Sequence, residues 1–165
     1  MKKIVLLFCL ASSPVLATDQ QININVHGYV AAMPCELETI NHVIDLKKVN
    51  VWNIRETQAS PWVDFSIKLK NCPMGTKEAI MEIKGTPDST TTDYFINTGS
   101  AKNVALNLAH HADKATIKNG EKITVPVNEQ TRKVDIPLSA RMAGYGSGMT
   151  SGSFNSHLDF TFVYH

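Results

Sequence analysis

The sequence predicts an all-β sandwich, and three observations lead to that prediction. Apolar and polar residues alternate with a period of two along most of the chain, which is typical of strands with one buried face. Turn signals such as Asn119-Gly120 separate the alternating runs, and many short strands favour a sandwich. The 165 residues amount to about one domain, and they contain no internal repeat.

The clearest alternation inside the chain occurs in three runs whose apolar residues share one phase. These residues are Val63, Phe65, Ile67 and Leu69; Ile123, Val125 and Val127; and Val134, Ile136, Leu138, Ala140 and Met142. Two further segments, 76–84 and 100–115, are compatible with either strands or amphipathic helices. Because the runs around them indicate strands, we expect strands in both segments.

Both ends of the chain after residue 17 alternate even more strongly. At the C-terminal end one face carries Phe154, Ser156, Leu158, Phe160, Phe162 and Tyr164, and at the N-terminal end one phase holds Ile22, Ile24, Val26, Gly28 and Val30. Each end is compatible with an ordinary edge strand of its own sandwich. The N-terminal run is also compatible with a strand supplied to another protein, since an unpaired sheet edge readily accepts a foreign strand.

Residues 1–17 have the organisation of a secretory signal peptide. Lys2 and Lys3 precede an apolar run over residues 4–11, and Val15-Leu16-Ala17 places small residues where such peptides are cleaved. The alternative is a membrane anchor, but the run is much shorter than the ~20 residues that span a bilayer. No later stretch is long and apolar enough to span one either.

Cleavage after residue 17 removes Cys9 and leaves Cys35 and Cys72 as the cysteines of the exported chain. Two cysteines in an oxidising compartment indicate one disulfide, which would stabilise the fold by about 4 kcal/mol on the chain-entropy account. The alternative is a pair of buried free thiols. A metal site at these cysteines is disfavoured, because no histidine or further cysteine lies near either one.

Composition and motifs argue against nucleic-acid binding and catalysis. The formal net charge is +1 and 19% of the residues are charged, whereas nucleic-acid binders usually carry a strongly basic patch. The sequence lacks the hydrolase elbow, the zinc-protease helix motif, the phosphate-binding loop and a Cys-x-x-Cys pair. We therefore expect no enzyme activity and no cofactor.

Three other groups of residues are candidate binding sites. His110-His111 is the best metal candidate, but adjacent strand residues face opposite sides, so a solvated pair is favoured. Trp52 and Trp62 are able to stack on a sugar, although Trp62 begins an alternating run and is expected in the core. The polar segment 88–93 is interpreted as a loop and only remotely as a calcium site. We therefore expect no metal site.

Short motifs near both ends and around the cysteines resemble those of chaperone–usher pilus subunits. The segment 26–30 followed by Pro34-Cys35 is similar to their N-terminal donor arm and first cysteine. The segment 71–76, Asn-Cys-Pro-Met-Gly-Thr, resembles the second-cysteine motif of minor tip-fibrillum pilins of type 1 fimbriae. Gly152 and the penultimate Tyr164 match the C-terminal signature of the family. The resemblance extends over the whole exported chain.

The resemblance implies an incomplete immunoglobulin-like sandwich that lacks its last strand and is completed by donor-strand exchange. Residues 18–30 would form the donor arm and 31–165 the pilin domain, with Gly28 as the small member of the arm's apolar set. A groove beside the C-terminal strand would bind first a periplasmic chaperone and then the arm of the next subunit. The residues implied for this strand are Gly152, Phe154, Leu158, Phe160, Phe162, Tyr164 and His165, whose carboxylate would anchor to the chaperone.

The implied function is a structural subunit of a fimbria that supports cell adhesion. Its partners would be the chaperone, an outer-membrane usher and neighbouring subunits, among them a tip adhesin or a rod pilin. Such a subunit is secreted through the periplasm to the cell surface. Within the family, a terminator or rod subunit remains an alternative. A glycan-binding adhesin is the alternative from another class, although two-domain tip adhesins are about twice this length.

Overall fold

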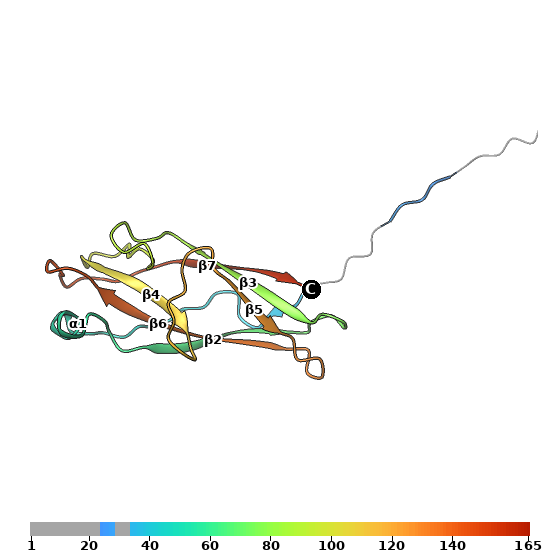
Figure 1. Cartoon of the computed structure of the whole chain (residues 1–165), viewed down its shortest axis with the longest axis horizontal. Helices are drawn as coiled ribbons and strands as arrows, with labels where there is room; N and C mark the ends of the chain where they lie inside the picture. The colour runs from blue at the N-terminus through green and yellow to red at the C-terminus, as the bar shows by residue number, and fades with distance from the viewer. Residues whose placement is uncertain (1–23, 29–33) are drawn as a thin grey trace, which may run out of the picture. The chain divides into compact units, whose positions relative to one another are not determined.

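The computed structural model describes residues 24–28 and 34–165, and residues 34–165 form one compact unit. The signal peptide predicted over residues 1–17 lies outside the described residues. The unit is built mainly from strands (Figure 1), whose bounds are β1 (Glu36–Leu37), β2 (Val63–Lys70), β3 (Glu78–Gly85), β4 (Val104–His110), β5 (Lys122–Pro126), β6 (Val134–Gly144) and β7 (Leu158–Tyr164). One helix, α1 (Val51–Thr57), interrupts the series.

The strands form two sheets that pack face to face, with every pair antiparallel. One sheet has the order β1-β2-β6-β4 and the other has the order β5-β3-β7. Both sheets contain strands far apart in the sequence, as when β2 pairs with β6 from Val63–Ala140 to Leu69–Val134. The predicted all-β sandwich is therefore confirmed.

The inward-facing residues of the two sheets make one continuous apolar core. Alternation along β2 and β6 places Ile67, Leu69, Ile136 and Leu138 inside, each with an exposed fraction of 2% or less. The polar residues between them, such as Asp135, face water. The period of two in the sequence therefore indicated the correct buried face of β2 and β6.

The two ambiguous segments contain strands, as expected, with narrower bounds. β3 covers Glu78–Gly85, and β4 covers only Val104–His110 of the segment 100–115. β4 is buried along both faces, which explains why its sequence lacks a polar phase. Its outer edge is occupied by Phe95, which exchanges backbone hydrogen bonds with Leu106, and by Ile117, whose N–H donates to the Leu108 carbonyl.

The helix α1 has no counterpart among the elements predicted from the sequence. Its first turn is capped by Asn50, whose side chain accepts a hydrogen bond from the Trp52 N–H. Ile54 is buried, and the helix ends at Gln58 in the left-handed conformation with φ of 61°. α1 closes one end of the sandwich, and the C-terminus of β7 lies at the other end (Figure 1).

Cys35 and Cys72 form the predicted disulfide. Both sulfur-bearing residues are buried, and the bond joins the chain just before β1 to the chain just after β2. β1 itself contributes only two residues to the sheet, with Leu37 opposite Leu69. The disulfide therefore holds in place an edge strand whose own pairing is short.

Candidate functional site: the open edge of the sandwich

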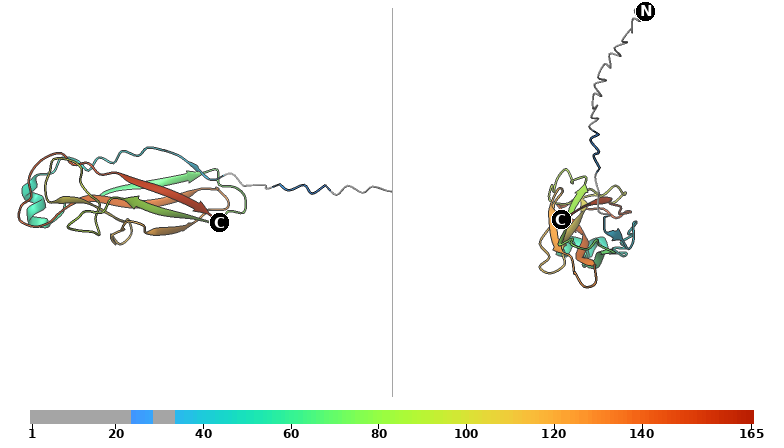
Figure 2. Two further views of the ribbon diagram at one scale, coloured as in Figure 1. Left: turned by 90° about the horizontal axis from the view of Figure 1, so that it is seen from above. Right: turned by 90° about the vertical axis from the view of Figure 1, so that its right-hand side faces the viewer.

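Among the residues that the structure describes, β7 lies at the edge of its sheet and pairs on one side only. It lies beside β3 in antiparallel register, with Tyr164 opposite Ala79 and Phe162 opposite Met81. The opposite end of the same sheet is β5, which packs against β6 of the other sheet. β7 is therefore on the side of the sandwich where the other sheet ends in the short strand β1, as the end-on view in Figure 2 shows.

Burial changes abruptly between β3 and β7. Ala79, Met81 and Ile83 on β3 have an exposed fraction of 0%. Their partners on β7, together with Leu158 opposite Gly85, face the same core and include large aromatic rings, yet these four residues are only half-buried: Leu158, Phe160, Phe162 and Tyr164. A strand next to β7 would normally cover these side chains. We call this unpaired side of β7, with these four residues, the open edge.

The backbone of β7 leaves hydrogen-bonding groups free along the open edge. His165 and Glu78 exchange both backbone hydrogen bonds, with N···O distances of 3.1 Å. Pairs in an antiparallel ladder alternate between bonded and non-bonded, so every second residue directs its N–H and C=O away from β3. These are the residues of the open edge, whose backbone groups therefore point to where a further strand would lie.

Two aromatic rings of the open edge contact each other. The Phe162 and Tyr164 rings are nearly parallel, at an interplanar angle of 11°, with their centroids 6.4 Å apart. Partial burial raises the pKa of the Tyr164 phenol above its usual 10.0. These stacked rings give the open edge an apolar floor that remains accessible to solvent.

The chain facing the open edge from the other sheet is the segment 38–50, which has no regular secondary structure apart from bends at its start. Leu46 packs against the core, whereas Ile40 and Val43 are 84% and 93% exposed. Both residues therefore leave branched apolar side chains in contact with water. Both sheets therefore end on this side with incomplete pairing.

The outer edges of the two sheets on the opposite side are protected. β4 is covered by the hydrogen bonds of Phe95 and Ile117, as described above. β5 carries the exposed Lys122 and ends in Pro126, which lacks an N–H to offer. Charged residues and proline at an edge discourage further strands, so β7 is the edge that this sandwich leaves available.

The chain that leads into β7 corrects one expectation. Alternation predicted one strand from Phe154 onward, but β7 begins at Leu158. Asn155 bonds instead to a loop, because its N–H donates to the Asn97 Oδ1 at 2.9 Å and its carbonyl accepts from the Thr98 N–H at 2.7 Å. These contacts hold the segment 154–157 away from β3, although Phe154 still packs against the core.

Gly152 occupies a position where only glycine fits without movement. A Cβ atom there would lie 2.4 Å from the backbone N of Ala101 and 2.7 Å from the carbonyl carbon of Ser100. Backbone atoms of an adjacent loop cannot move aside as a flexible side chain can. Gly152 therefore acts by allowing the chain to pass closely beside residues 100–101 before it enters β7.

The predicted donor arm is described only in its middle part. Residues 24–28 have no regular secondary structure, and the side chains of Ile24 and Val26 are 78% and 86% exposed. A Cβ atom added to Gly28 would meet no atom within 4 Å. Ile22 and Val30, the outer members of the predicted set, lie outside the described residues.

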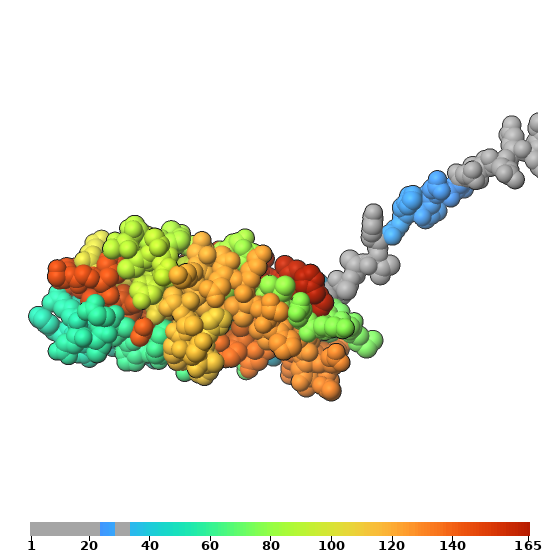
Figure 3. All heavy atoms as spheres, in the orientation of Figure 1, coloured from blue at the N-terminus to red at the C-terminus, as the bar shows by residue number. Residues whose placement is uncertain are grey.

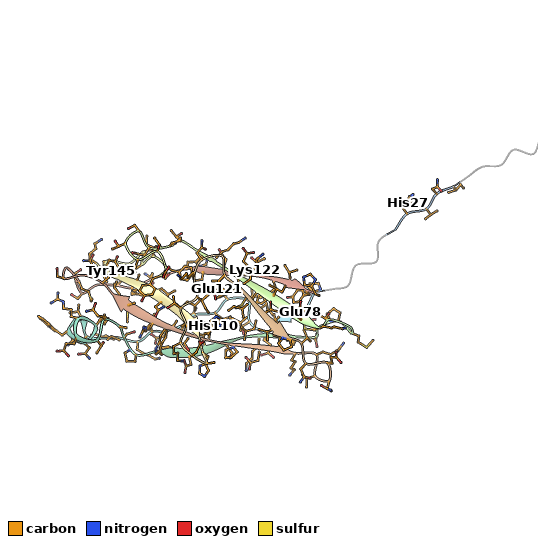
Figure 4. The ribbon with its side chains drawn as sticks, viewed as in Figure 1. His27, Glu78, His110, Glu121, Lys122 and Tyr145 are labelled. Carbon is orange, nitrogen blue, oxygen red and sulfur yellow. A yellow bond between two sulfur atoms is a disulfide. The ribbon has the colours of Figure 1, made fainter. Side chains whose placement is uncertain are left out.

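The other groups considered from sequence are engaged in contacts within the domain. His110 pairs with Glu121 at 3.2 Å (Figure 4), and His111 pairs with Asp64 at 3.3 Å. Within residues 24–28 and 34–165 there is no cluster of three histidine, cysteine or acidic residues able to hold a metal ion. No helix in that same part of the chain is long and apolar enough to cross a membrane.

The expectation that Trp62 belongs to the core is wrong. Trp62 is half-buried on the outer face of β2, where the Arg141 guanidinium lies 4.1 Å from its ring centroid. The neighbouring Asp64 accepts hydrogen bonds from Lys114 and Ser139, which lower the pKa of that carboxyl to about 2. Trp62 directly precedes Val63, so the period of two places it in the outward phase with Asp64 and not in the core.

The polar segment 88–93 forms a loop around the buried side chain of Asp88. Burial opposes ionisation of this carboxyl, but hydrogen bonds from the backbone of Thr91 and Thr90 and from the Tyr145 hydroxyl lower its pKa. The loop therefore supplies its own donors to the acidic group. This is the arrangement of a structural turn.

Comparison of the sequence with known proteins finds fimbrial relatives over nearly the whole chain. The chain is 31% identical over 159 residues to Protein FimG of Escherichia coli (strain K12), covering 96% of this chain and 92% of that protein. It is 30% identical to the uncharacterized fimbrial-like protein YdeR of the same organism, covering 95% and 92%. No protein-family model matches the chain.

The fold is also found in solved structures of pilus proteins. The P pilus rod subunit PapA matches with a TM-score of 0.66 at 14% identity, covering 81% of this chain and 100% of that one. The CupB6 tip adhesin from Pseudomonas aeruginosa matches with a TM-score of 0.65 at 19% identity. That match covers 78% of this chain and 38% of the adhesin. At these identities the structures support the fold alone.

Proposed function

The chain belongs to the family of chaperone–usher fimbrial subunits, and from this premise we propose that it enters the fibre by giving one strand and accepting another. The accepting site is the open edge of β7. The donated strand is the arm over residues 18–30, with Ile22, Ile24, Val26, Gly28 and Val30 on its apolar face. The half-burial of the β7 side chains beside fully buried partners on β3 is the observation that carries this proposal.

The apolar face of the arm matches the chemistry of the open edge. Burial of one isoleucine or valine side chain contributes about 1.5–3 kcal/mol, so the arm's four branched residues would contribute roughly 6–12 kcal/mol before ordering costs. The free N–H and C=O groups of β7 add a ladder of hydrogen bonds to this. The isolated sandwich lacks both contributions, which makes strand addition the favourable way to complete its core.

Alternation along the arm sets the register of the added strand. A shift of one residue would turn every apolar side chain outward and bring Asn23, Asn25 and His27 toward the core. Gly28 occupies the next position of the apolar face and has no side chain to place there. We propose that Gly28 lies where the side chains of the accepting site come closest to the backbone of the donated strand.

Growth of a fibre requires the arm to run antiparallel to β7. Each subunit's arm joins its domain beside Cys35, at the same end as the C-terminus of β7. A parallel arm would leave the acceptor at that end, where the acceptor's own arm begins. An antiparallel arm leaves at the α1 end instead, so the subunits follow one another head to tail without crowding.

The remaining partners follow from family membership. We propose that a periplasmic chaperone covers the open edge during transit, that an outer-membrane usher receives the complex, and that the mature fibre at the cell surface supports adhesion. The His165 backbone is hydrogen-bonded to Lys77 and Glu78 at the start of β3, which places the terminal carboxylate at the end of the open edge. An available open edge favours an internal subunit over a terminator.

A pair of adjacent substitutions in the arm tests strand donation. Val26→Asp places a charge on the apolar phase of the arm, and Asn25→Asp places the same charge on the opposite phase. We expect fibres in which this subunit is internal to be lost with Val26→Asp and retained with Asn25→Asp, as seen by electron microscopy. Equal assembly of the two variants would contradict the assignment of the donated face.

A further inference from the structure

The end of the sandwich closed by α1 carries an exposed tryptophan that stacks with an arginine of the same helix. Trp52 is 62% exposed, and the Arg55 guanidinium lies 4.7 Å from the centroid of its ring. Arg55 also donates a hydrogen bond to the Met149 carbonyl, and Ile54 anchors the helix in the core. A rigid aromatic side chain loses little conformational entropy on binding, so residues of this kind often dominate protein interfaces.

The opposite end of the sandwich carries an open surface hollow of about 260 Å³. It is lined by the β2–β3 loop and the β5–β6 loop, including Pro73, Met74, Val127, Glu129 and Arg132. Met74 at its rim is 89% exposed. The volume is below the ~300–1,000 Å³ of small-molecule pockets, which suits a single large side chain. Figure 3 shows α1 and these two loops at opposite ends of the domain.

Strand exchange brings these two ends together. Cys35 is bonded to Cys72, which adjoins the hollow, and only residues 31–34 separate it from the apolar set of the arm. Five residue steps span at most about 18 Å. An antiparallel arm leaves its acceptor at the start of β7, where Phe154 packs against the cluster around Ile54 of α1. The donor's hollow must therefore lie close to the acceptor's helix.

We propose that Trp52 of one copy docks in the hollow of a second copy, the one that donates its arm. This contact rests on the proposed strand exchange and adds to it a direct interface between the two sandwich domains. The charges of the two surfaces are complementary, because Arg55 and the exposed Glu56 on α1 would meet Glu129 and Arg132 at the hollow. Both halves of the interface are present on this chain, which is why the partner is a second copy.

Photo-cross-linking tests the contact in assembled fibres. Trp52→p-benzoylphenylalanine is introduced in the mature chain, fibres are assembled from equal amounts of ¹⁵N-labelled and unlabelled chains, and the irradiated product is digested for mass spectrometry. We expect mixed-isotope cross-links from position 52 to residues 73–76 or 127–132. The matched control is Trp62→p-benzoylphenylalanine, in the middle of the domain, for which we expect at least tenfold fewer such links.

The outcomes separate this interface from strand exchange itself. If wild-type chains form no fibres, strand exchange between copies of this chain fails and the interface with it, while exchange with other subunits is tested separately by the Val26→Asp and Asn25→Asp pair. If fibres form but position 52 links to other residues, or no more than position 62 does, the interface alone is refuted. Should the position 52 variant not assemble, Asn53→p-benzoylphenylalanine on the same exposed turn gives the same readout.

Discussion

Replacing Phe162 by alanine is expected to destabilise the isolated domain modestly and the strand-completed domain strongly. A phenylalanine in a closed core costs about 3–5 kcal/mol when truncated to alanine. Phe162 is only half-buried beside the fully buried Met81, so about half of that cost applies before a strand is added. The remaining 1.5–2.5 kcal/mol appears only when the arm covers the ring.

The assay is binding of a synthetic peptide of residues 20–31 to the domain without its own arm. A difference of about 1.5–2.5 kcal/mol corresponds to a dissociation constant roughly 10- to 70-fold weaker for Phe162→Ala than for the parent domain. Urea unfolding with and without saturating peptide measures the same difference in binding free energy independently, because a ligand that binds only the folded state raises the stability of that state.

The control substitution lies on the far side of the core. Ile117 is fully buried beside β4, away from the open edge, so Ile117→Val is expected to cost about 0.5–1.5 kcal/mol with or without peptide. Its peptide affinity should equal that of the parent domain. If Phe162→Ala also leaves the affinity unchanged, the peptide does not cover β7, and the assignment of the open edge as the accepting site is incorrect.

Three further outcomes are expected. Cys72→Ala should lower the free energy of unfolding by about 2–5 kcal/mol in urea titrations, since the disulfide closes a sequence separation of 37 residues. Lys114→Met should raise the pKa of Asp64 from about 2 toward 3.8 in an NMR titration. The pKa of Asp64 is lower in the folded protein than in the unfolded chain. The carboxylate therefore stabilises the fold above about pH 4, and this contribution is lost as the pH falls through about 2. Gly152→Ala should lower the melting temperature of the domain by several degrees. Gly28→Trp should leave the melting temperature unchanged and slow fibre assembly. Equal melting temperatures for the two variants would contradict the close packing at Gly152.

The strands and the disulfide were predictable because their signals are local. A half-buried strand must alternate, so β2, β5 and β6 are visible in the sequence with errors of a residue or two at their ends. Two cysteines behind a signal peptide leave a single pairing. The resemblance at Gly152 and Tyr164 indicated the family, and the relatives over nearly the whole chain confirmed it.

The elements that were missed depend on contacts between distant residues. α1 has seven residues, too few for a helical period to stand out, and its buried residue Ile54 packs against β6 and the segment before β7. The late start of β7 depends on Asn97, whose side-chain oxygen accepts a hydrogen bond from the N–H of Asn155. Trp62 is half-buried outside the core because Arg141 and Lys114, both distant in sequence, lie over its ring.

The sequence by itself determined that this chain forms a disulfide-bonded sandwich with an apolar face on its last strand. It did not determine whether that face is covered, because alternation looks the same in a closed core and beside a missing strand. Only the tertiary structure decided this, by placing β7 at an unpaired edge next to a two-residue β1. Burial is a property of neighbours, and within the described residues β7 has a neighbouring strand on one side only.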